Sequence, residues 1–330
     1  MKGITEKFKN NPSFFYAMSI AATWAGAGSF IVGTKVAQTA GLIPWLLWAL
    51  GNSLTCIVFG IIATKFKVVR KVANSLPMKL LMGFMAIFQI WLNMTGIHEM
   101  LDPVIGQYAS YGIIYCLAIF FLFFYLKKAT YRNVMTDNGS WSFVYLIIFA
   151  MVVISLLVNG FKGIPICSGV DEIKAKSWTM ITLMFGGFFY PTFWELLDYN
   201  DKNEGEANKI NIRNSFIMGG LMFGFYLLFV LLGACTEYLP WMNVVKAILV
   251  SLVAISSLSS FIYSVFIDYG KKFGMAINIG AIALWAVLVP MGIMFIWNAM
   301  QNIRIWMVFG MFIISFIVWI ISKIKGKEVE

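Results

Sequence analysis

The densest group of hydroxyl side chains in the chain lies in an apolar stretch that reads "VAISSLSSFIYS". Ser257, Ser260 and Ser264 share one helical face with Val253, because residues three or four positions apart lie on the same side of a helix. Two adjacent hydroxyls deep in a helix suit a small hard cation, which prefers oxygen ligands. Serine hydroxyls also bond back to the preceding turn or join helices, so the cluster alone fits a cation site and helix packing equally.

A second unusual stretch, "TWAGAGSFIVG" at residues 23–33, places three glycines inside an apolar run. Glycine costs up to about 1 kcal/mol per residue in a helix interior. A dinucleotide-binding turn would need a third glycine three residues on and an acidic residue roughly twenty residues later. The corresponding sequence, "WALGNSLTCIVFG", has no carboxylate. Taken alone, the glycines fit the close packing of membrane helices as well as an interrupted helix.

A matching interruption occurs in the second half of the chain, where "FGGFFYP" at residues 185–191 combines two glycines with a proline. Proline removes a backbone hydrogen bond and clashes with the preceding helical turn. Unwound backbone inside a membrane is tolerated where protein or a water-filled cavity covers it, and its carbonyls can then hold ions. Glycine also serves close packing of membrane helices, but two interruptions at corresponding places favour broken helices.

The elements that carry these residues are predicted to be membrane spans. Of the 330 residues, 60% are hydrophobic and 12% are charged, whereas a soluble domain carries about a quarter charged residues. Apolar runs of about twenty residues are long enough to cross a bilayer. We expect an all-α polytopic membrane protein with ten transmembrane helices, at residues 13–37, 41–64, 77–99, 109–126, 141–160, 177–198, 212–235, 241–267, 274–297 and 303–323.

The distribution of basic residues predicts the orientation of these spans. With the N-terminus inside, the inner segments, such as "KFKVVRKVANSLPMK" and "KIKGKEVE", hold most of the 25 Lys and Arg residues. We therefore expect an integral protein of the cell membrane with both termini cytoplasmic. The net charge of +10 then reflects contact with the lipid bilayer and its anionic surface rather than nucleic-acid binding.

The ten predicted spans divide into two sets of five, at residues 1–158 and 177–330, joined by a polar extracellular linker at 159–176. Because five is odd, the second set enters the membrane from the opposite side, as in an inverted repeat. Spans 13–37 and 177–198 are then corresponding first members, and both contain an interruption. We expect one integral membrane domain built as a 5+5 inverted repeat, with its first and sixth helices discontinuous.

This combination of features resembles the LeuT-fold transporters of the amino acid–polyamine–organocation superfamily. Within it, "VAISSLSS" is similar to the sodium-site helix of the sodium:solute symporter family. The stretch "WAGAGSFIVGTKVAQTAGLIPWLLWALGN" resembles the first two core helices of that family. The chain departs from the family in having no predicted helices outside the ten-helix core, which leaves the substrate open.

The resemblance implies a sodium-coupled symporter that carries a small organic solute, such as an amino acid or nucleobase, by alternating access, with Na⁺ as the coupling ion. Sodium would be held by the hydroxyls of Ser256 and Ser257 and by the carbonyls of Val253, Ala25 and Gly28. Solute contacts in such folds come from both breaks and from the third and eighth helices. The candidates here are Trp24, Ser29, Gln89, Asn93, Phe185, Gly187, Phe189, Tyr190, Thr192 and Ser260.

An integral membrane enzyme that uses magnesium is the first of two alternative classes of protein. Asp198 and Asp201 form a DxxD motif, "DYND", which resembles the magnesium-binding motifs of membrane prenyltransferases; those enzymes carry paired Asp-rich loops, and this sequence has one. GxSxG, HExxH and P-loop motifs are absent, so we do not expect an enzyme. A non-transporting sensor that kept the fold is the third class, and the serine pair and both breaks weigh against it.

The cysteines and the single histidine predict no further metal site, because no CxxC or Cys/His spacing occurs. Cys167 and Cys235 both fall on the predicted outer side, where a disulfide could form, although two unpaired thiols are the simpler expectation. No feature of the sequence indicates an obligate protein partner.

Overall fold

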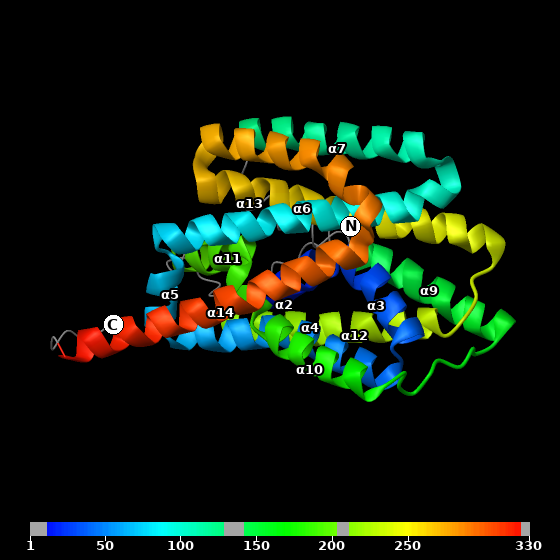
Figure 1. Cartoon of the computed structure of the whole chain (residues 1–330), viewed down its shortest axis with the longest axis horizontal. Helices are drawn as coiled ribbons and strands as arrows, with labels where there is room; N and C mark the ends of the chain where they lie inside the picture. The colour runs from blue at the N-terminus through cyan, green and yellow to red at the C-terminus, as the bar shows by residue number, and fades with distance from the viewer. Residues whose placement is uncertain (1–11, 129–141, 203–210, 325–330) are drawn as a thin grey trace.

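The computed structural model of the chain describes residues 12–128, 142–202 and 211–324. Across these ranges the secondary structure is helical and includes no strand (Figure 1). Before residue 160 the helices are α2 (Pro12–Trp24), α3 (Ala27–Thr39), α4 (Leu42–Lys65), α5 (Lys67–Ala73), α6 (Leu76–Ile105), α7 (Gln107–Lys128) and α9 (Ser142–Asn159). After it come α10 (Val170–Met184), the 3₁₀ helix η1 (Gly186–Phe189), α11 (Pro191–Lys202), α12 (Ile212–Ala234), α13 (Pro240–Leu288), the 3₁₀ helix η2 (Val289–Met291) and α14 (Gly292–Ile324).

Several of these helices are long and apolar enough to cross a membrane, as expected of a membrane-embedded protein. By length and composition, five segments of the described residues meet this criterion, and six do if the bent pair α2–α3 counts as one span. The longest segment, Pro240–Ile324, joins α13, η2 and α14. Ten crossings and the inverted repeat stay predictions. Both chain termini lie outside the described residues, so the predicted cytoplasmic side of each is not observed.

α13 is a helical hairpin rather than one straight rod. In its middle, Gly270 has a φ of 75° and a ψ of 167°, a backbone conformation that favours glycine. The Asn278 side chain donates a hydrogen bond of 3.1 Å to the Ile262 carbonyl, which joins the two arms of the hairpin. The turn lies in "DYGKK", the segment between the predicted spans 241–267 and 274–297.

The structure differs from the prediction at the last chain reversal. The sequence predicts spans at 274–297 and 303–323, whereas α14 already begins at Gly292. The connection runs through η2, and Gly292 has a φ of 76°. The predicted boundary at residues 298–302 is therefore wrong, because these residues lie inside a helix. A smaller difference occurs at the predicted linker 159–176, which is helical from its twelfth residue, Val170, onward, where α10 begins.

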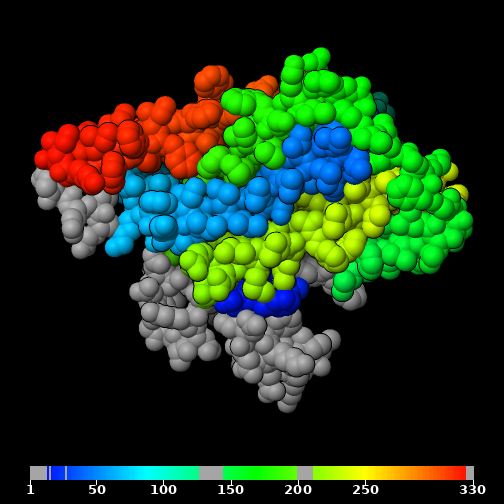
Figure 2. Space-filling model, turned by 90° about the horizontal axis from the view of Figure 1, so that it is seen from below, coloured from blue at the N-terminus to red at the C-terminus, as the bar shows by residue number. Residues whose placement is uncertain are grey.

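The helices form two groups with the first interrupted helix between them. α6, α7 and α13 pack together (Figure 1), and α4 packs between α10 and α12 (Figure 2). α2 and α3 contact α12 of the second group and α13 of the first, and α14 crosses against both α6 and α10. This arrangement buries the break between α2 and α3 in the centre of the molecule.

Small residues allow α12 to approach its neighbours closely, which is how helices associate where lipid replaces water. A Cβ on Gly219 would lie 3.0 Å from the Ala17 carbonyl oxygen of α2. On the other side, the Ser53 hydroxyl of α4 donates a 2.8 Å hydrogen bond to the Gly220 carbonyl.

The structure answers the question of the disulfide left open by the sequence. Cys167 and Cys235 are free, as the simpler expectation held. The Cys167 thiol contacts the Gly169 carbonyl at 3.1 Å, and Cys235 is buried at the end of α12.

Candidate functional site

The first interruption lies between α2 and α3, where Ala25 and Gly26 are not helical. Gly26 is extended, with a φ of −64° and a ψ of 178°, and the two helical arms are bent by 58°. The backbone N–H and the hydroxyl of Ser29 both donate to the Gly26 carbonyl, at 3.0 and 2.7 Å. The glycines of "TWAGAGS" thus coincide with a real break, which Ser29 closes on the α3 side.

Tyrosine hydroxyls from other helices bond the carbonyls of the interrupted turn. Tyr145 of α9 donates to the Ala25 carbonyl at 3.1 Å, and Tyr190 donates to the Thr23 carbonyl at 3.2 Å. Because Tyr190 directly follows η1, the second bond connects the two interruptions. The Ala25 carbonyl, which the resemblance suggested as a sodium ligand, is here an acceptor for a tyrosine.

The second interruption separates α10 from α11 through η1 (Gly186–Phe189). Side chains again bond the carbonyls that the break frees. The Thr55 hydroxyl donates to the Leu183 carbonyl, and Trp194 Nε1 donates to the Phe188 carbonyl at 2.8 Å. Both breaks are therefore stabilised by specific partners, as buried backbone groups require.

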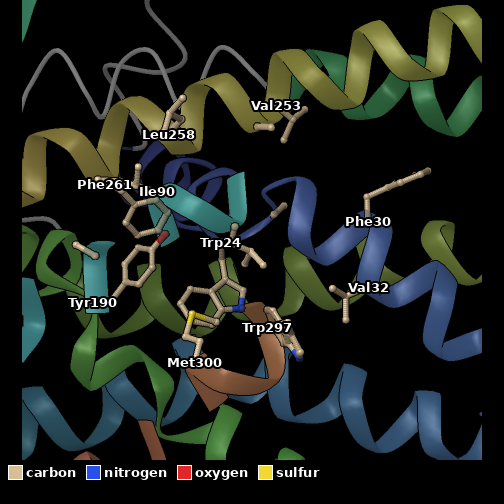
Figure 3. Close-up of a cluster of buried hydrophobic side chains, with 14 of the residues drawn as sticks. Trp24, Phe30, Val32, Ile90, Tyr190, Val253, Leu258, Phe261, Trp297 and Met300 are labelled. Atoms are coloured by element: carbon tan, nitrogen blue, oxygen red, sulfur yellow. The ribbon is translucent and has the colours of Figure 1, made fainter. Parts of the chain in front are cut away.

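A buried cavity of about 30 Å³ lies beside both interruptions, and a volume of this size holds about two water molecules. Aromatic rings form part of its wall: Trp24 and Tyr190 lie 4.9 Å apart between ring centroids, and Tyr190 and Phe261 lie 5.0 Å apart. Figure 3 shows Trp24 close to Met300 and Trp297, with Tyr190 and Phe261 on its other side. The predicted site residues that line the cavity are Trp24, Gly28, Ser29, Gln89, Asn93, Tyr190 and Ser257.

Other predicted residues do not line this cavity, and several lining residues were not predicted. The predicted residues outside the lining are Ala25, Phe185, Gly187, Phe189, Thr192, Val253, Ser256 and Ser260. The lining residues that sequence reasoning missed are Thr23, Gly26, Asn52, Leu92, Phe261, Trp297 and Arg304.

Two oxygen atoms beside Gly26 are the most distinctive feature of the lining. Asn93 Oδ1 and Ser257 Oγ are both buried and have no hydrogen-bond partner. Each lies 2.9 Å from the position that a Cβ on Gly26 would occupy. The other end of the Asn93 amide is fixed, because its Nδ2 donates to the Gln89 carbonyl at 2.8 Å. Buried oxygens without partners are unusual in folded proteins, and a cation or a polar solute would satisfy them.

Several other serines of the cluster bond within their own helix. The hydroxyls of Ser259 and Ser260 both donate to the Ser256 carbonyl, at 2.7 and 3.2 Å. Ser264 donates to the Ser260 carbonyl at 2.9 Å. Such bonds to the preceding turn agree with the packing interpretation for these residues. Only Ser257 of this cluster lines the cavity.

Arg304 is the charged residue of the cavity lining. It lies in α14, and only 2% of its surface is exposed. Its Cζ is 5.9 Å from the centroid of the Trp24 ring. The sequence signal that identifies it is one arginine inside the apolar helical run "IWNAMQNIRIWMVFGMF", which the misplaced boundary at 298–302 put at a membrane surface.

Ion pairs lie beyond the cavity in both directions along α6. Near the C-terminal end of α6, Glu99 pairs with Lys35 of α3 at 2.7 Å and accepts from the Ile293 backbone N–H at 2.9 Å. Next to the opposite end of α6, Arg70 of α5 pairs with Asp198 of α11 at 2.5 Å. The DxxD motif thus contributes Asp198 to an ion pair. Among the residues that the structure describes, no group of three or more His, Cys, Asp or Glu is arranged to hold a metal.

Comparison with protein-family models and with characterised proteins finds no match to the chain.

Proposed function

We propose that this chain is a sodium-coupled symporter, a secondary active transporter that carries a small organic solute across a membrane by alternating access. One observation carries the proposal: two interrupted helices, α2–α3 and α10–α11, lie beside one buried polar cavity. An interrupted helix in an apolar bundle loses regular backbone hydrogen bonds. Such interruptions occur in membrane proteins where a cavity or an ion site uses the freed backbone groups.

The proposal includes the LeuT-like fold that the sequence resembles, with ten crossings in a 5+5 inverted repeat and cytoplasmic termini. Two observations support it. The interruptions fall in spans 13–37 and 177–198, the corresponding first members of the two predicted halves. The Tyr190–Thr23 hydrogen bond brings these two interruptions together, as a binding site at the interface of two repeats requires.

We place the coupling sodium beside Gly26, where Asn93 Oδ1 and Ser257 Oγ are buried without partners. An ion there would connect α6 with α13 across the break between α2 and α3. Coupling requires that sodium bind one conformation of the protein more tightly than the other. A sodium ion that joins these helices would favour the outward-open state that receives the solute.

Uptake into proteoliposomes tests the proposal. Amino acids, nucleobases, sugars and small carboxylates are each presented with an inward sodium gradient and again with potassium in place of sodium. We expect at least one solute to accumulate only under the sodium gradient. Ser257→Ala should raise the sodium concentration for half-maximal uptake about tenfold. A tenfold change in affinity corresponds to about the free energy of one hydrogen bond, and the variant loses one sodium ligand.

Ser264→Ala is the matched control, because its hydroxyl bonds the Ser260 carbonyl and does not line the cavity. Its sodium dependence should equal that of the wild type. Uptake that follows an imposed proton gradient, or that proceeds equally without sodium, contradicts sodium coupling. Identical sodium dependence in the wild type and in Ser257→Ala contradicts the placement of the ion.

A further inference from the structure

Arg304 is a buried positive charge without a negative partner in the part of the chain that the structure describes. No carboxylate lies within ion-pair distance of its guanidinium, and none lines the cavity. Arginine keeps its proton under all ordinary conditions, so it cannot become neutral to fit an apolar surrounding. An uncompensated buried charge is strongly unfavourable, and an intramembrane charge normally has a functional partner.

Two of the three guanidinium nitrogens of Arg304 also lack a hydrogen-bond partner. Nε and Nη1 are buried and have no partner, and Nη2 contacts only the Met300 sulfur at 3.4 Å. A thioether sulfur is a weak acceptor without charge, and the same sulfur already receives the Gln89 amide at 3.2 Å. The guanidinium therefore has donors available for an acceptor that the protein itself does not supply.

The guanidinium lies beside both interruptions. Its Nη1 is 2.9 Å from the position that a Cβ on Gly186 would occupy, at the start of η1. On its other side, its Cζ lies over the Trp24 ring at the end of α2. A ligand bound to this group would contact the two elements whose rearrangement alternating access requires.

We propose that Arg304 binds the carboxylate group of a small organic anion, in a conformation of the protein whose cavity is larger than the present volume of about 30 Å³. The planar guanidinium fork matches the geometry of a carboxylate, which it binds in a bidentate manner. The inference rests on the proposed transport function and names its substrate class: a solute with a carboxylate, whose negative charge offsets Arg304 inside the membrane.

Equilibrium binding to the purified full chain in detergent tests this inference without any ion gradient. Thermal unfolding is followed with potassium acetate, propionate and lactate, and with the neutral amides acetamide, propionamide and lactamide. A ligand that binds only the folded protein raises the melting temperature. We expect at least one of the three carboxylates to raise the melting temperature of the wild type. The amide of the same shape should leave the melting temperature unchanged.

Arg304→Met separates a binding role from a structural one. Replacing an unpaired buried charge with an apolar side chain of similar length is often neutral or stabilising. We therefore expect the ligand-free variant to melt at or above the wild-type temperature, while its carboxylate affinity falls about 100-fold, as for truncation of a buried charge pair. Arg304→Lys keeps the charge without the fork and should lose about tenfold. Arg213→Met removes an exposed charge outside the cavity and should respond as the wild type does.

Three outcomes overturn the inference. The first is equal stabilisation by carboxylates and by amides, and the second is equal stabilisation by carboxylates and by potassium phosphate. The third is a full carboxylate response in Arg304→Met. If Arg304→Met does not fold, an unchanged response in Arg304→Lys overturns it in the same way. Carboxylate binding that depends on Arg304 without any sodium-driven uptake supports the inference and contradicts the symporter. Sodium-driven uptake of neutral solutes alone, unchanged by substitution of Arg304, supports the symporter and overturns the inference.

Discussion

At the scale of single residues, Gly26 determines the shape of the proposed sodium site. Its extended backbone leaves room for Asn93 Oδ1 and Ser257 Oγ, each 2.9 Å from the place of a missing Cβ. Carbon and oxygen atoms without a bond between them do not approach this closely without a shift of one side chain. The site therefore depends on the absence of a side chain at this position.

Gly26→Ala should weaken sodium binding at least about tenfold, equivalent to 1.4 kcal/mol, while the protein still folds. The added methyl group displaces Asn93 Oδ1 or Ser257 Oγ, and each is a proposed ligand. The measurement is the sodium-dependent rise in melting temperature, with potassium as the reference ion. Gly112→Ala on α7 is the control, because nothing lies within 4 Å of its added Cβ. A sodium response in Gly26→Ala equal to that of the control would show that the ion binds elsewhere.

Sequence analysis predicted part of the cavity lining but not its charged residue, Arg304. The Ser257 hydroxyl and the glycine break could be predicted, because hydroxyl density and helix-breaking residues are local properties of the chain. Which serine of the cluster faces the cavity could not, because the rotation of α13 is set by packing against α6 and α7. Arg304 was missed because its helix was predicted to begin about ten residues too late.

At the scale of elements, two glycines with positive φ decide where the C-terminal helices reverse direction. Gly270 divides α13 into two arms, and Gly292 begins α14. Residues other than glycine pay roughly 1–3 kcal/mol in this backbone region of positive φ and extended ψ. The turn at Gly270 was accessible to sequence reasoning because charged residues flank it in "DYGKK". The turn at Gly292 lies in the apolar "VPMG", where no charge separates the spans.

The same substitution at two glycines of α13 should change stability in opposite directions. Gly270→Ala should destabilise the protein by about 1–3 kcal/mol, because alanine strongly disfavours a φ of 75° combined with a ψ of 167°. Gly280→Ala should stabilise it by roughly 0.5–1 kcal/mol, because Gly280 is inside a helix with open space around its Cβ position. Thermal unfolding in detergent measures both. No loss of stability in Gly270→Ala contradicts the hairpin turn at Gly270, and a loss in Gly280→Ala contradicts the open helical position of Gly280.

At the scale of the whole molecule, ion pairs lie beyond the cavity in both directions along α6. Glu99 with Lys35 lies toward one end, and Arg70 with Asp198 lies beside the other. The α6 residues of the cavity lining, among them Leu92, lie between these ion pairs. A transporter that alternates between two open states must separate helices at one end while the other end stays closed. The apolar runs could predict which segments are helical, but not which ends are paired, because such contacts join residues far apart in the chain.

Access to the cavity from each side of the membrane tests the central claim most directly. Leu92 lines the cavity and is 3% exposed, so a single cysteine at this position, in a chain whose four native cysteines are replaced, reports when the cavity opens. A membrane-impermeant thiol reagent is applied to oriented vesicles from one side and then from the other. We predict that Leu92→Cys reacts from both sides, faster from outside with sodium and faster from inside without it. Equal rates with and without sodium, or reaction from one side alone, would contradict alternating access driven by sodium.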